Sequence, residues 1–281
     1  MARLDLHLHT TRSDGSLPPA AVVALAKKAN VTALAITDHD TVDGIAEALA
    51  AGRELEIEVI PGIEISSRWE GLELHILGYF IDWHDPVLLD RLTRYRATRH
   101  DRNPQIIARL NELGLAVTYD EVRELARTES IGRPHIARVL IEKGYVSSAK
   151  EAFDRYLADG AAAYVPRSLP DPAEAIALIR GAGGVPVLAH PSWIDRGNGM
   201  VDLCRHLKET GLAGIEVHYS THRPEQTNQY LNVARQLDLL VTGGSDFHGV
   251  TKPDIEVGIG RGQLHVPEKL LEPLKKAAGR A

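Results

Sequence analysis

The stretch RLDLHLHTTRSDG, residues 3–15, holds the pattern that decides the fold. Its first seven residues alternate between polar side chains and leucines. Alternation with a period of two predicts a β-strand whose leucines pack on one face. The opposite face then carries His7 and His9, two residues apart, with Asp14 in the turn that follows. Such a pair of imidazoles can grip one metal ion.

From this strand outward, short apolar runs alternate with helical patterns. The predicted strands are 3–9, 33–37, 57–61, 72–80, 185–189, 214–218 and 239–243. The predicted helices among them are 18–29, 42–53, 172–181, 200–210, 223–237 and 267–278. This rhythm is typical of βα units, and about seven such units predict an α/β barrel.

The middle of the chain lacks strand alternation and shows helical stretches instead. They cover 86–113, 119–127, 133–143 and 148–157. We therefore expect residues 85–164 to form an all-helical insertion that recognises the substrate, and residues 1–84 and 165–281 to form the barrel domain.

Composition limits the possible function. The 281 residues are 44% hydrophobic and carry a formal net charge of −6, which argues against a protein that coats long nucleic acid. The single cysteine, Cys204, excludes a disulfide within the chain and is expected to be a small buried side chain. No apolar run could span a membrane and no secretion signal is recognisable, so we expect a cytoplasmic protein with no membrane partner.

Histidines and carboxylates recur where predicted strands end. They occur in TDHD (37–40), PGIE (61–64), LHI (74–76), LAHP (188–191) and SDFH (245–248). The ends of barrel strands converge on one mouth, where active sites are built. Each of these residues alone could be a structural histidine or a capping aspartate, but together they predict a metal site.

These motifs, in this order and over nearly the whole chain, resemble those of the PHP (polymerase and histidinol phosphatase) family. The resemblance implies a distorted barrel of seven βα units that binds two or three divalent metal ions. It implies three ligand sets: His7, His9, Glu64 and Asp246; Glu64, His75 and His190; and Asp14, His39 and His248. Asp14 stands where many relatives carry a histidine. Nitrogen and carboxylate ligands suit manganese, iron or zinc, and we favour Mn²⁺ over Fe²⁺ or Zn²⁺.

Adjacent divalent ions favour hydrolysis of a phosphate ester, because they activate a bridging water and stabilise the oxygens around phosphorus. We expect a bridging hydroxide to attack, with Glu64 as the bridging carboxylate. His218 shares a predicted strand face with Glu216 and is a candidate to contact the phosphate or protonate the leaving oxygen. A structural or surface role is the alternative for His218.

Arginines are concentrated between positions 91 and 109, in a chain that is acidic overall. Arg99, Arg102 and Asn103 fall on one helical face and could hold a second phosphate, although Pro104 could kink or end that helix. A solvated face or internal ion pairs is the alternative. The turn Gly132-Arg133-Pro134-His135 suggests another anion site, at a helix start where N–H groups are free and Arg133 and His135 add charge.

Together with the metal motifs, these features resemble the PHP subgroup that has a helical insertion. That resemblance implies a small nucleotide substrate with two phosphates. The leading hypothesis is a phosphatase that removes the 3'-phosphate of nucleoside 3',5'-bisphosphates, such as adenosine 3',5'-bisphosphate to AMP. The close alternative is a 5'-to-3' exoribonuclease acting on short RNA.

Other classes of function remain alternatives. They are a non-catalytic metal-binding PHP module and an amide hydrolase on a related barrel, for which the arginine-rich anion sites offer less support. Protein partners cannot be inferred. Tryptophans are more often packing residues than base platforms, although Trp193, after His190-Pro191, is expected near the mouth.

Overall fold

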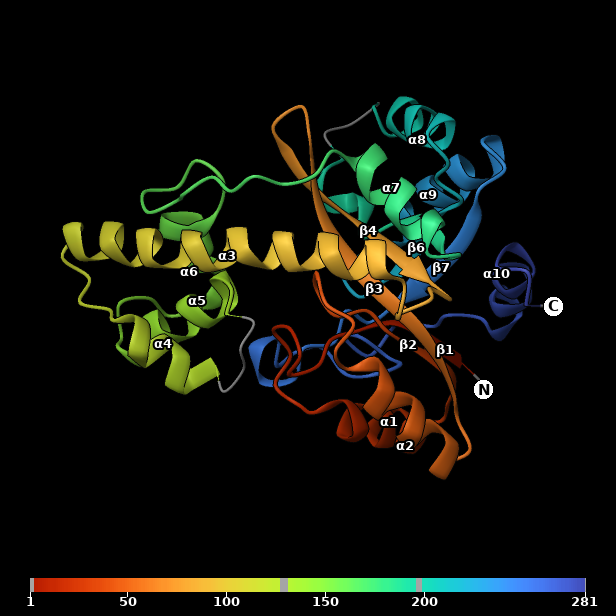
Figure 1. The fold of residues 1–281 in the computed structure, drawn as a ribbon, viewed down its shortest axis with the longest axis horizontal. Coiled ribbons are helices and arrows are strands. Elements are labelled where there is room, and N and C mark those ends of the chain that lie inside the picture. Colours follow the sequence, from red (N-terminus) through yellow and green to blue (C-terminus); the bar gives the residue numbers. More distant parts are fainter. Residues whose placement is uncertain (1–2, 127–130, 196–198, 281) are drawn as a thin grey trace.

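The computed structural model describes residues 3–126, 131–195 and 199–280, and it confirms the α/β class. Seven strands form one sheet in the order β1 to β7, with helices outside it (Figure 1). The strands are β1 (Arg3–Leu8), β2 (Val31–Ile36), β3 (Glu58–Trp69), β4 (Leu72–Tyr79), β5 (Val185–Leu188), β6 (Gly214–Tyr219) and β7 (Leu240–Gly244).

The helices lie close to the predicted stretches. They are α1 (Pro19–Lys28), α2 (Ile45–Glu54), α3 (Pro86–Glu112), α4 (Tyr119–Ala126), α5 (Arg133–Glu142), α6 (Ala149–Ala152), α7 (Pro172–Gly181), α8 (Met200–Glu209), α9 (Pro224–Gln236) and α10 (Leu271–Ala277). Short turns of other helix types are η1 (Phe153–Leu157), η2 (Pro191–Trp193), η3 (Gly249–Thr251) and η4 (Glu268–Leu270). Position 127, the end of one predicted helix, lies outside the described residues.

The sheet closes almost completely into a barrel, as predicted. The backbone N–H of His9 donates to the carbonyl of Phe247 at 3.0 Å, and that of Asp246 donates to His7 at 2.9 Å, which joins the first strand to the segment after the last. The barrel is distorted because β4 runs antiparallel to both β3 and β5. A hairpin turn at Glu70 and Gly71, both with positive φ, links β3 to β4 without a helix. This hairpin is the exception to the predicted strand-helix alternation.

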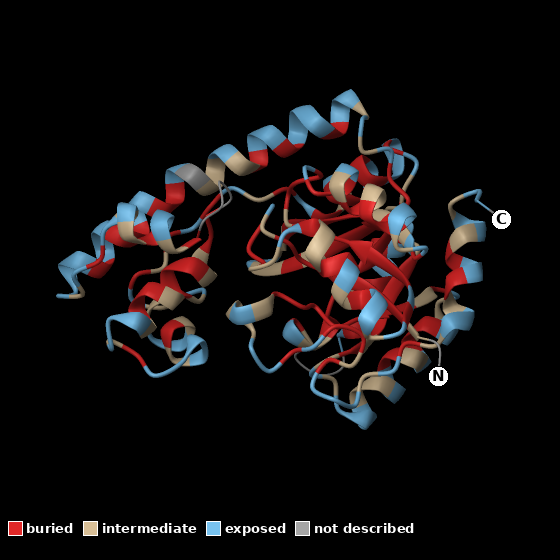
Figure 2. Cartoon of the chain, turned by 90° about the horizontal axis from the view of Figure 1, so that it is seen from below, coloured by how far each residue is buried: buried red, intermediate tan, exposed pale blue. Residues whose placement is uncertain are grey.

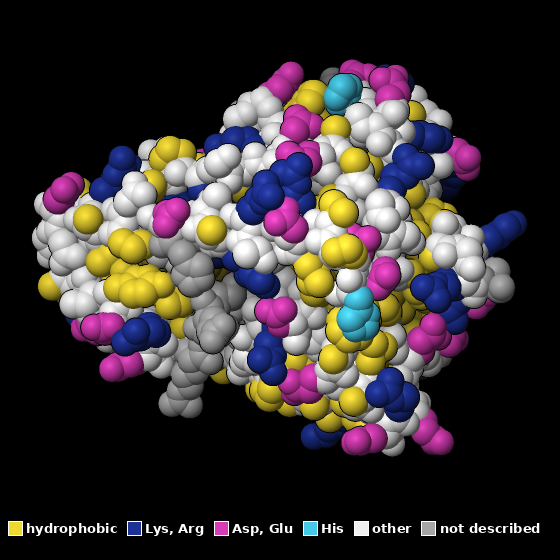
Figure 3. Space-filling view, viewed as in Figure 1, with side chains coloured by type: hydrophobic (Ala, Val, Ile, Leu, Met, Phe, Trp, Pro, Cys, Tyr) yellow, Lys and Arg dark blue, Asp and Glu magenta, His cyan; other side chains and the backbone are white. Residues whose placement is uncertain are grey.

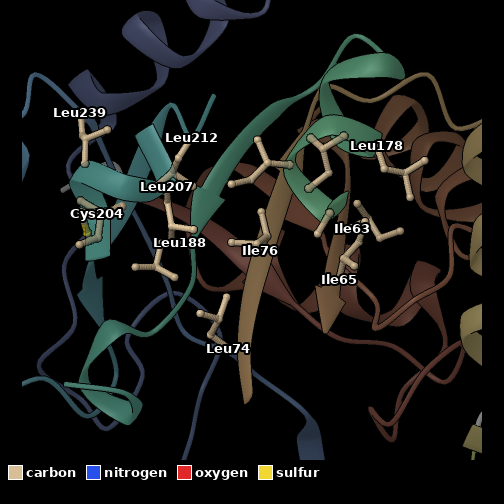
Figure 4. Close-up of a cluster of buried hydrophobic side chains, with 14 of the residues drawn as sticks. Ile63, Ile65, Leu74, Ile76, Leu178, Leu188, Cys204, Leu207, Leu212 and Leu239 are labelled. Carbon is tan, nitrogen blue, oxygen red and sulfur yellow. The ribbon is translucent and has the colours of Figure 1, made fainter. Parts of the chain in front are cut away.

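Apolar side chains between the sheet and its covering helices form the main core (Figure 4). Ile63 and Ile65 of β3, Ile76 of β4 and Leu188 of β5 are completely buried. Burying a side chain of this size stabilises a fold by about 1.5–3 kcal/mol. The predicted burial of Cys204 is confirmed, since it lies on α8 within this core.

Helix α3 belongs to two cores. Its first half sends Leu88 and Leu92 into the barrel core, while its second half sends Ile106 and Leu110 into a separate cluster with α4, α5 and their loops. Buried residues accordingly gather in two places, in the barrel and among the insertion helices (Figure 2). The division into 1–84 with 165–281 and 85–164 stays a prediction, which this second core supports.

Pro104 does not end α3, which continues to Glu112 (Figure 1). A proline inside a helix removes one backbone hydrogen bond, but packing on both sides of Pro104 holds the helix together. Among the described residues no helix is both long enough and apolar enough to cross a membrane. On the face drawn in Figure 3, basic and acidic side chains are interspersed and neither sign forms a broad area.

Candidate metal centre and substrate pocket

The histidine pair of β1 lies at the mouth of the barrel. His7 and His9 are completely buried, and their Nε2 atoms are 3.1 Å apart. Gly244 of β7 makes room for them, because a Cβ at that position would lie 2.4 Å from the Cβ of His7. Nδ1 of His7 lies 2.9 Å from the Glu216 carboxylate, which fixes the ring and directs Nε2 toward His9.

Glu64, at the centre of β3, contacts five imidazoles. Its Oε1 lies 2.9 Å from Nδ1 of His75 and 3.0 Å from Nε2 of His190. Its Oε2 lies within reach of three more rings, at 3.0 Å from His39, 3.2 Å from His9 and 3.3 Å from His7. Burial opposes the charge of Glu64, but His39, His7 and His75 outweigh it and hold the pKa well below its usual value. The carboxylate is therefore ionised and central.

Two further carboxylates complete the cluster. Asp246 Oδ1 lies 3.3 Å from Nε2 of His9 and 3.6 Å from that of His7. Asp14 Oδ1 lies 3.2 Å from Nε2 of His248, and Asp14 Oδ2 lies 3.9 Å from Nε2 of His39. All nine predicted metal ligands thus converge on one region, which we call the histidine cluster: His7, His9, Asp14, His39, Glu64, His75, His190, Asp246 and His248.

The histidine cluster fits divalent metal ions. Oδ1 of Asp14, Nδ1 of His39 and Oε2 of Glu64 are buried and, despite the short distances to neighbouring groups, form no hydrogen bond of normal geometry, although buried polar atoms are almost always paired. Ligand atoms within 4.8 Å of one another occur in three groups: His9, Asp14, His39 and His248; His7, His9 and Asp246; and His39, Glu64 and His75. Nitrogen and carboxylate donors without sulfur suit hard and borderline divalent ions.

The backbone is held in unusual conformations at the cluster. His190 and Asp246 have positive φ, 26° and 57°, which non-glycine residues rarely adopt. Such strain concentrates at functional sites, where surrounding contacts maintain it. His75, like His7 and Glu64, lies within a strand rather than after one, and on β4 it is opposite Ser66 of β3. The antiparallel direction of β4 is what brings its first half to the mouth.

A pocket of about 340 Å³ opens beside the histidine cluster. Its lining includes four cluster residues, four arginines, Lys252 and Trp193. A volume of this size suits a small organic ligand. Three of the predicted substrate residues that line it come from α3, and two lie at the start of α5: Arg99, Arg102, Asn103, Gly132 and Arg133.

We call the four arginines of the pocket the arginine wall: Arg99, Arg102, Arg133 and Arg167. Arg99 and Arg167 share one carboxylate, that of Asp40, at 2.6 and 3.4 Å. Arg133 pairs with Glu73 at 3.0 Å.

Arg102 is different from the rest of the wall. It is only 5% exposed, and no carboxylate among the described residues pairs with it. Its Nε and Nη2 lack hydrogen-bond partners, and its guanidinium lies 5.2 Å from the ring centroid of Tyr164. Burial, reinforced by Arg133, lowers the pKa of Arg102 to about 9, so it remains mostly charged at pH 7. A buried unpaired guanidinium beside a pocket is a site for an anion.

The predicted anion site at the start of α5 needs correction. The N–H of Gly132 is not free, because it donates to Nδ1 of His135 at 3.0 Å. Burial lowers the pKa of His135 to about 4, so the ring is neutral at pH 7 and adds no positive charge. His135 therefore positions the turn, while Arg133 supplies the charge.

The prediction for His218 is also not supported. A register irregularity in β6 separates it from Glu216, whose carboxylate contacts His7 and the backbone N–H of His190. After burial, which lowers the pKa of His218, the groups that act on it are His265, His222 and Lys269, none of which belongs to the histidine cluster. The alternative of a structural histidine fits better.

Sequence reasoning missed several residues of the site. Glu73, two residues before His75, shares its strand face, so the period of two could have indicated it. Lys252 lies 2.5 Å from Asp246, and Tyr219 donates to the same carboxylate at 2.7 Å. Arg167 lies in an irregular segment after η1, where no local pattern indicates a role.

The sequence is similar to those of known proteins. A family model described as PHP domain matches residues 5–159. The 5'-3' exoribonuclease Rnm of Escherichia coli is 38% identical over 263 residues, 90% of this chain and 87% of that protein. The 3',5'-nucleoside bisphosphate phosphatase of Chromobacterium violaceum is 35% identical over 260 residues, 92% of this chain and 91% of that protein.

Solved structures agree as well. A chain from Bifidobacterium adolescentis named as a metal-dependent phosphoesterase has a TM-score of 0.88 and 31% identity, covering 99% of this chain and 96% of its own. A structure from Chromobacterium violaceum called an amidohydrolase, with bound sulfate, has a TM-score of 0.89 and 32% identity. It covers 98% of this chain and 96% of its own. The chain therefore belongs to the PHP family and is a metal-dependent hydrolase of phosphate esters.

Proposed function

We propose that this enzyme removes the 3'-phosphate from nucleoside 3',5'-bisphosphates, for example converting adenosine 3',5'-bisphosphate to AMP. The observation that carries the proposal is the buried Arg102, which has no carboxylate partner among the described residues and shares one pocket with the histidine cluster. Two anion-binding ends in one pocket match a substrate with two phosphates. The similarity to a protein named as such a phosphatase supports the same substrate class.

The metal ions are proposed to bind as the family resemblance implies. The first set is His7, His9, Glu64 and Asp246; the second is Glu64, His75 and His190; the third is Asp14, His39 and His248. Manganese is the preferred metal, with iron or zinc as alternatives. Bound divalent ions supply an activated water and neutralise the oxygens around phosphorus.

The protein groups have separate tasks in this proposal. Glu64 bridges between ligand sets, because its two oxygens face different imidazoles. Arg102, Arg99 and Arg133 bind the 5'-phosphate and orient the nucleotide so that its 3'-phosphate lies at the histidine cluster. Helix α3 and the start of α5, both from the proposed recognition segment 85–164, carry these arginines.

A 5'-to-3' exoribonuclease on short RNA is the second candidate. The relatives named as exoribonucleases, from Escherichia coli and Haemophilus influenzae, are each 38% identical to this chain. A 5'-phosphate held by the arginine wall and a phosphodiester at the histidine cluster would use the same pocket. A non-catalytic module is less suitable because every predicted ligand converges, and amide hydrolysis leaves the arginine wall without a role. A cytoplasmic location stays a prediction.

The test is to assay the protein, loaded with Mn²⁺, Fe²⁺ or Zn²⁺, on adenosine 3',5'-bisphosphate and on a 5'-phosphorylated tetraribonucleotide. The proposal expects phosphate release and AMP, with the higher kcat/KM on the bisphosphate. Metal-stripped protein is the control. Equal or faster degradation of the tetranucleotide would establish the exoribonuclease instead, and no phosphate release with any metal would refute the phosphatase.

A further inference from the structure

Trp193 is an exposed tryptophan inside the substrate pocket. It ends the short turn η2, directly after the ligand His190, and it lines the pocket together with the arginine wall. Its side chain is 56% exposed, unlike the packing role expected from sequence. A large aromatic surface left open in a nucleotide pocket calls for a ligand group that can cover it.

Neighbouring side chains hold the indole in place. The rings of Trp193 and His190 stack, with centroids 3.9 Å apart and planes at 27°. Lys252 Nζ lies over the Trp193 ring at 5.5 Å from its centroid, within cation–π range, and lies 2.5 Å from Asp246. The indole is therefore oriented by His190 and Lys252, while 56% of its surface stays exposed.

A chain of contacts links the arginine wall to Trp193. Arg133 pairs with Glu73 at 3.0 Å, and Glu73 lies 3.6 Å from His75. Beyond these, Glu64 contacts both His75 and His190, and His190 stacks on Trp193. The histidine cluster thus lies between the arginine wall and Trp193 in this chain of contacts.

We propose that Trp193 is a stacking platform for the nucleobase on the 3' side of the phosphate being hydrolysed. This inference rests on the proposed function, which places a 5'-phosphate at the arginine wall and the next phosphate at the histidine cluster. Whatever is attached beyond that phosphate then meets Trp193. Every base has a π-face, so the platform accepts any second nucleotide.

The chemistry is the same with or without this second nucleotide. The oxygen of water bonds to phosphorus, the bond from phosphorus to the 3'-oxygen of the first nucleoside breaks, and that 3'-oxygen takes up a proton. A bisphosphate then releases inorganic phosphate, whereas a dinucleotide releases a second nucleotide with a 5'-phosphate. Trp193 determines how well the longer substrate is used.

The test compares two substrates in each variant. One is a 5'-phosphorylated diribonucleotide, and the other is its analogue without the second base. The ratio of interest is kcat/KM for the dinucleotide divided by kcat/KM for the analogue. If the second base stacks on Trp193, Trp193→Ala should lower this ratio about 10-fold, and Trp193→Phe should keep most of the wild-type ratio. Trp69→Phe is the matched control, because Trp69 lies outside the pocket and should keep the wild-type ratio. An equal loss of kcat/KM on both substrates would contradict stacking and would mean that Trp193 only holds His190 in position.

A fluorescence titration keeps the inference testable if Trp193→Ala does not fold. The chain has three tryptophans, so Trp69→Phe with Trp83→Phe leaves Trp193 as the reporter. With Ca²⁺ in place of the active metal, the dinucleotide should quench its emission more strongly than the analogue without the second base. Equal quenching would contradict stacking. Bisphosphate hydrolysis by the wild type is measured separately, so failure of the proposed function is distinguishable from failure of the platform.

Discussion

The histidine cluster and the arginine wall face the same pocket but differ in how their charges are balanced. In the cluster, each carboxylate contacts imidazoles, and Glu64 alone contacts five. In the wall, the described residues give three of the four arginines carboxylate partners, Asp40, Glu73 and Asp159, and give Arg102 none. The cluster thus offers nitrogen and oxygen ligand atoms that suit metal cations, while the wall has excess positive charge that suits an anion.

The largest expected effect comes from the centre of the cluster. Glu64→Gln removes one carboxylate oxygen from a group that contacts five imidazoles, so metal content and activity should fall together. Losing several kcal/mol of metal-assisted stabilisation corresponds to a decrease in kcat of about 10³-fold or more. Metal analysis and phosphate release measure the two effects, with the exposed Glu112→Gln as control. Full metal content with full activity would contradict the central role of Glu64.

A smaller effect, on binding rather than on chemistry, is expected at the wall. Arg102→Met removes charge-assisted hydrogen bonds to the 5'-phosphate, so KM for the bisphosphate should rise about 10- to 100-fold. The melting temperature should not fall, because the variant also removes a buried charge that has no carboxylate partner among the described residues.

Arg94→Met is the matched control for Arg102→Met. Arg94 lies on the same helix but is exposed and pairs with Asp90. An exposed ion pair of this kind contributes little, so neither KM nor stability should change appreciably. If both variants raised KM equally, the general charge of α3, rather than the wall, would bind the substrate.

The pH dependence of stability distinguishes the neutral turn at α5 from the charged wall. Burial, reinforced by Arg99, lowers the pKa of His135 from 6.5 to about 4. Between these values the unfolded chain binds a proton that the folded protein does not, so stability falls as pH decreases from 6.5 to 4. The loss between pH 7 and 5 is about 2 kcal/mol.

His135→Gln tests this effect, because glutamine can accept the same backbone hydrogen bond but does not titrate. Urea denaturation at pH 5 and pH 7 should give the variant a smaller difference in the free energy of unfolding than the wild type. The same difference in both proteins would mean that His135 is not the group responsible.

The smallest effect is expected at His218, outside both regions. His218→Ala should change kcat/KM by less than about 2-fold, since the side chains that act on it, His265, His222 and Lys269, lie outside the histidine cluster. A large loss of kcat with unchanged metal content would show that His218 is catalytic. Its side chain would then have to point from β6 toward the histidine cluster.

The two regions also differ in how far sequence predicts them. Cluster ligands such as His7 and Glu64 follow strand patterns, and the ends of barrel strands must converge, so their meeting was predictable. Arg167 lies in an irregular segment, and only the three-dimensional fold brings it to the pocket, whereas the position of Trp193 after His190-Pro191 already indicated the mouth. Local pattern also placed His218 beside Glu216, because a strand irregularity cannot be read from residue types.

The most direct test of the account compares a nucleoside 3',5'-bisphosphate with the corresponding nucleoside 3'-monophosphate. Both offer the same phosphate to the histidine cluster, but only the first has a 5'-phosphate for the arginine wall. We expect kcat/KM of the metal-loaded enzyme to be about 100-fold higher for the bisphosphate. Equal values for the two substrates would contradict it, because the wall would then contribute nothing to recognition.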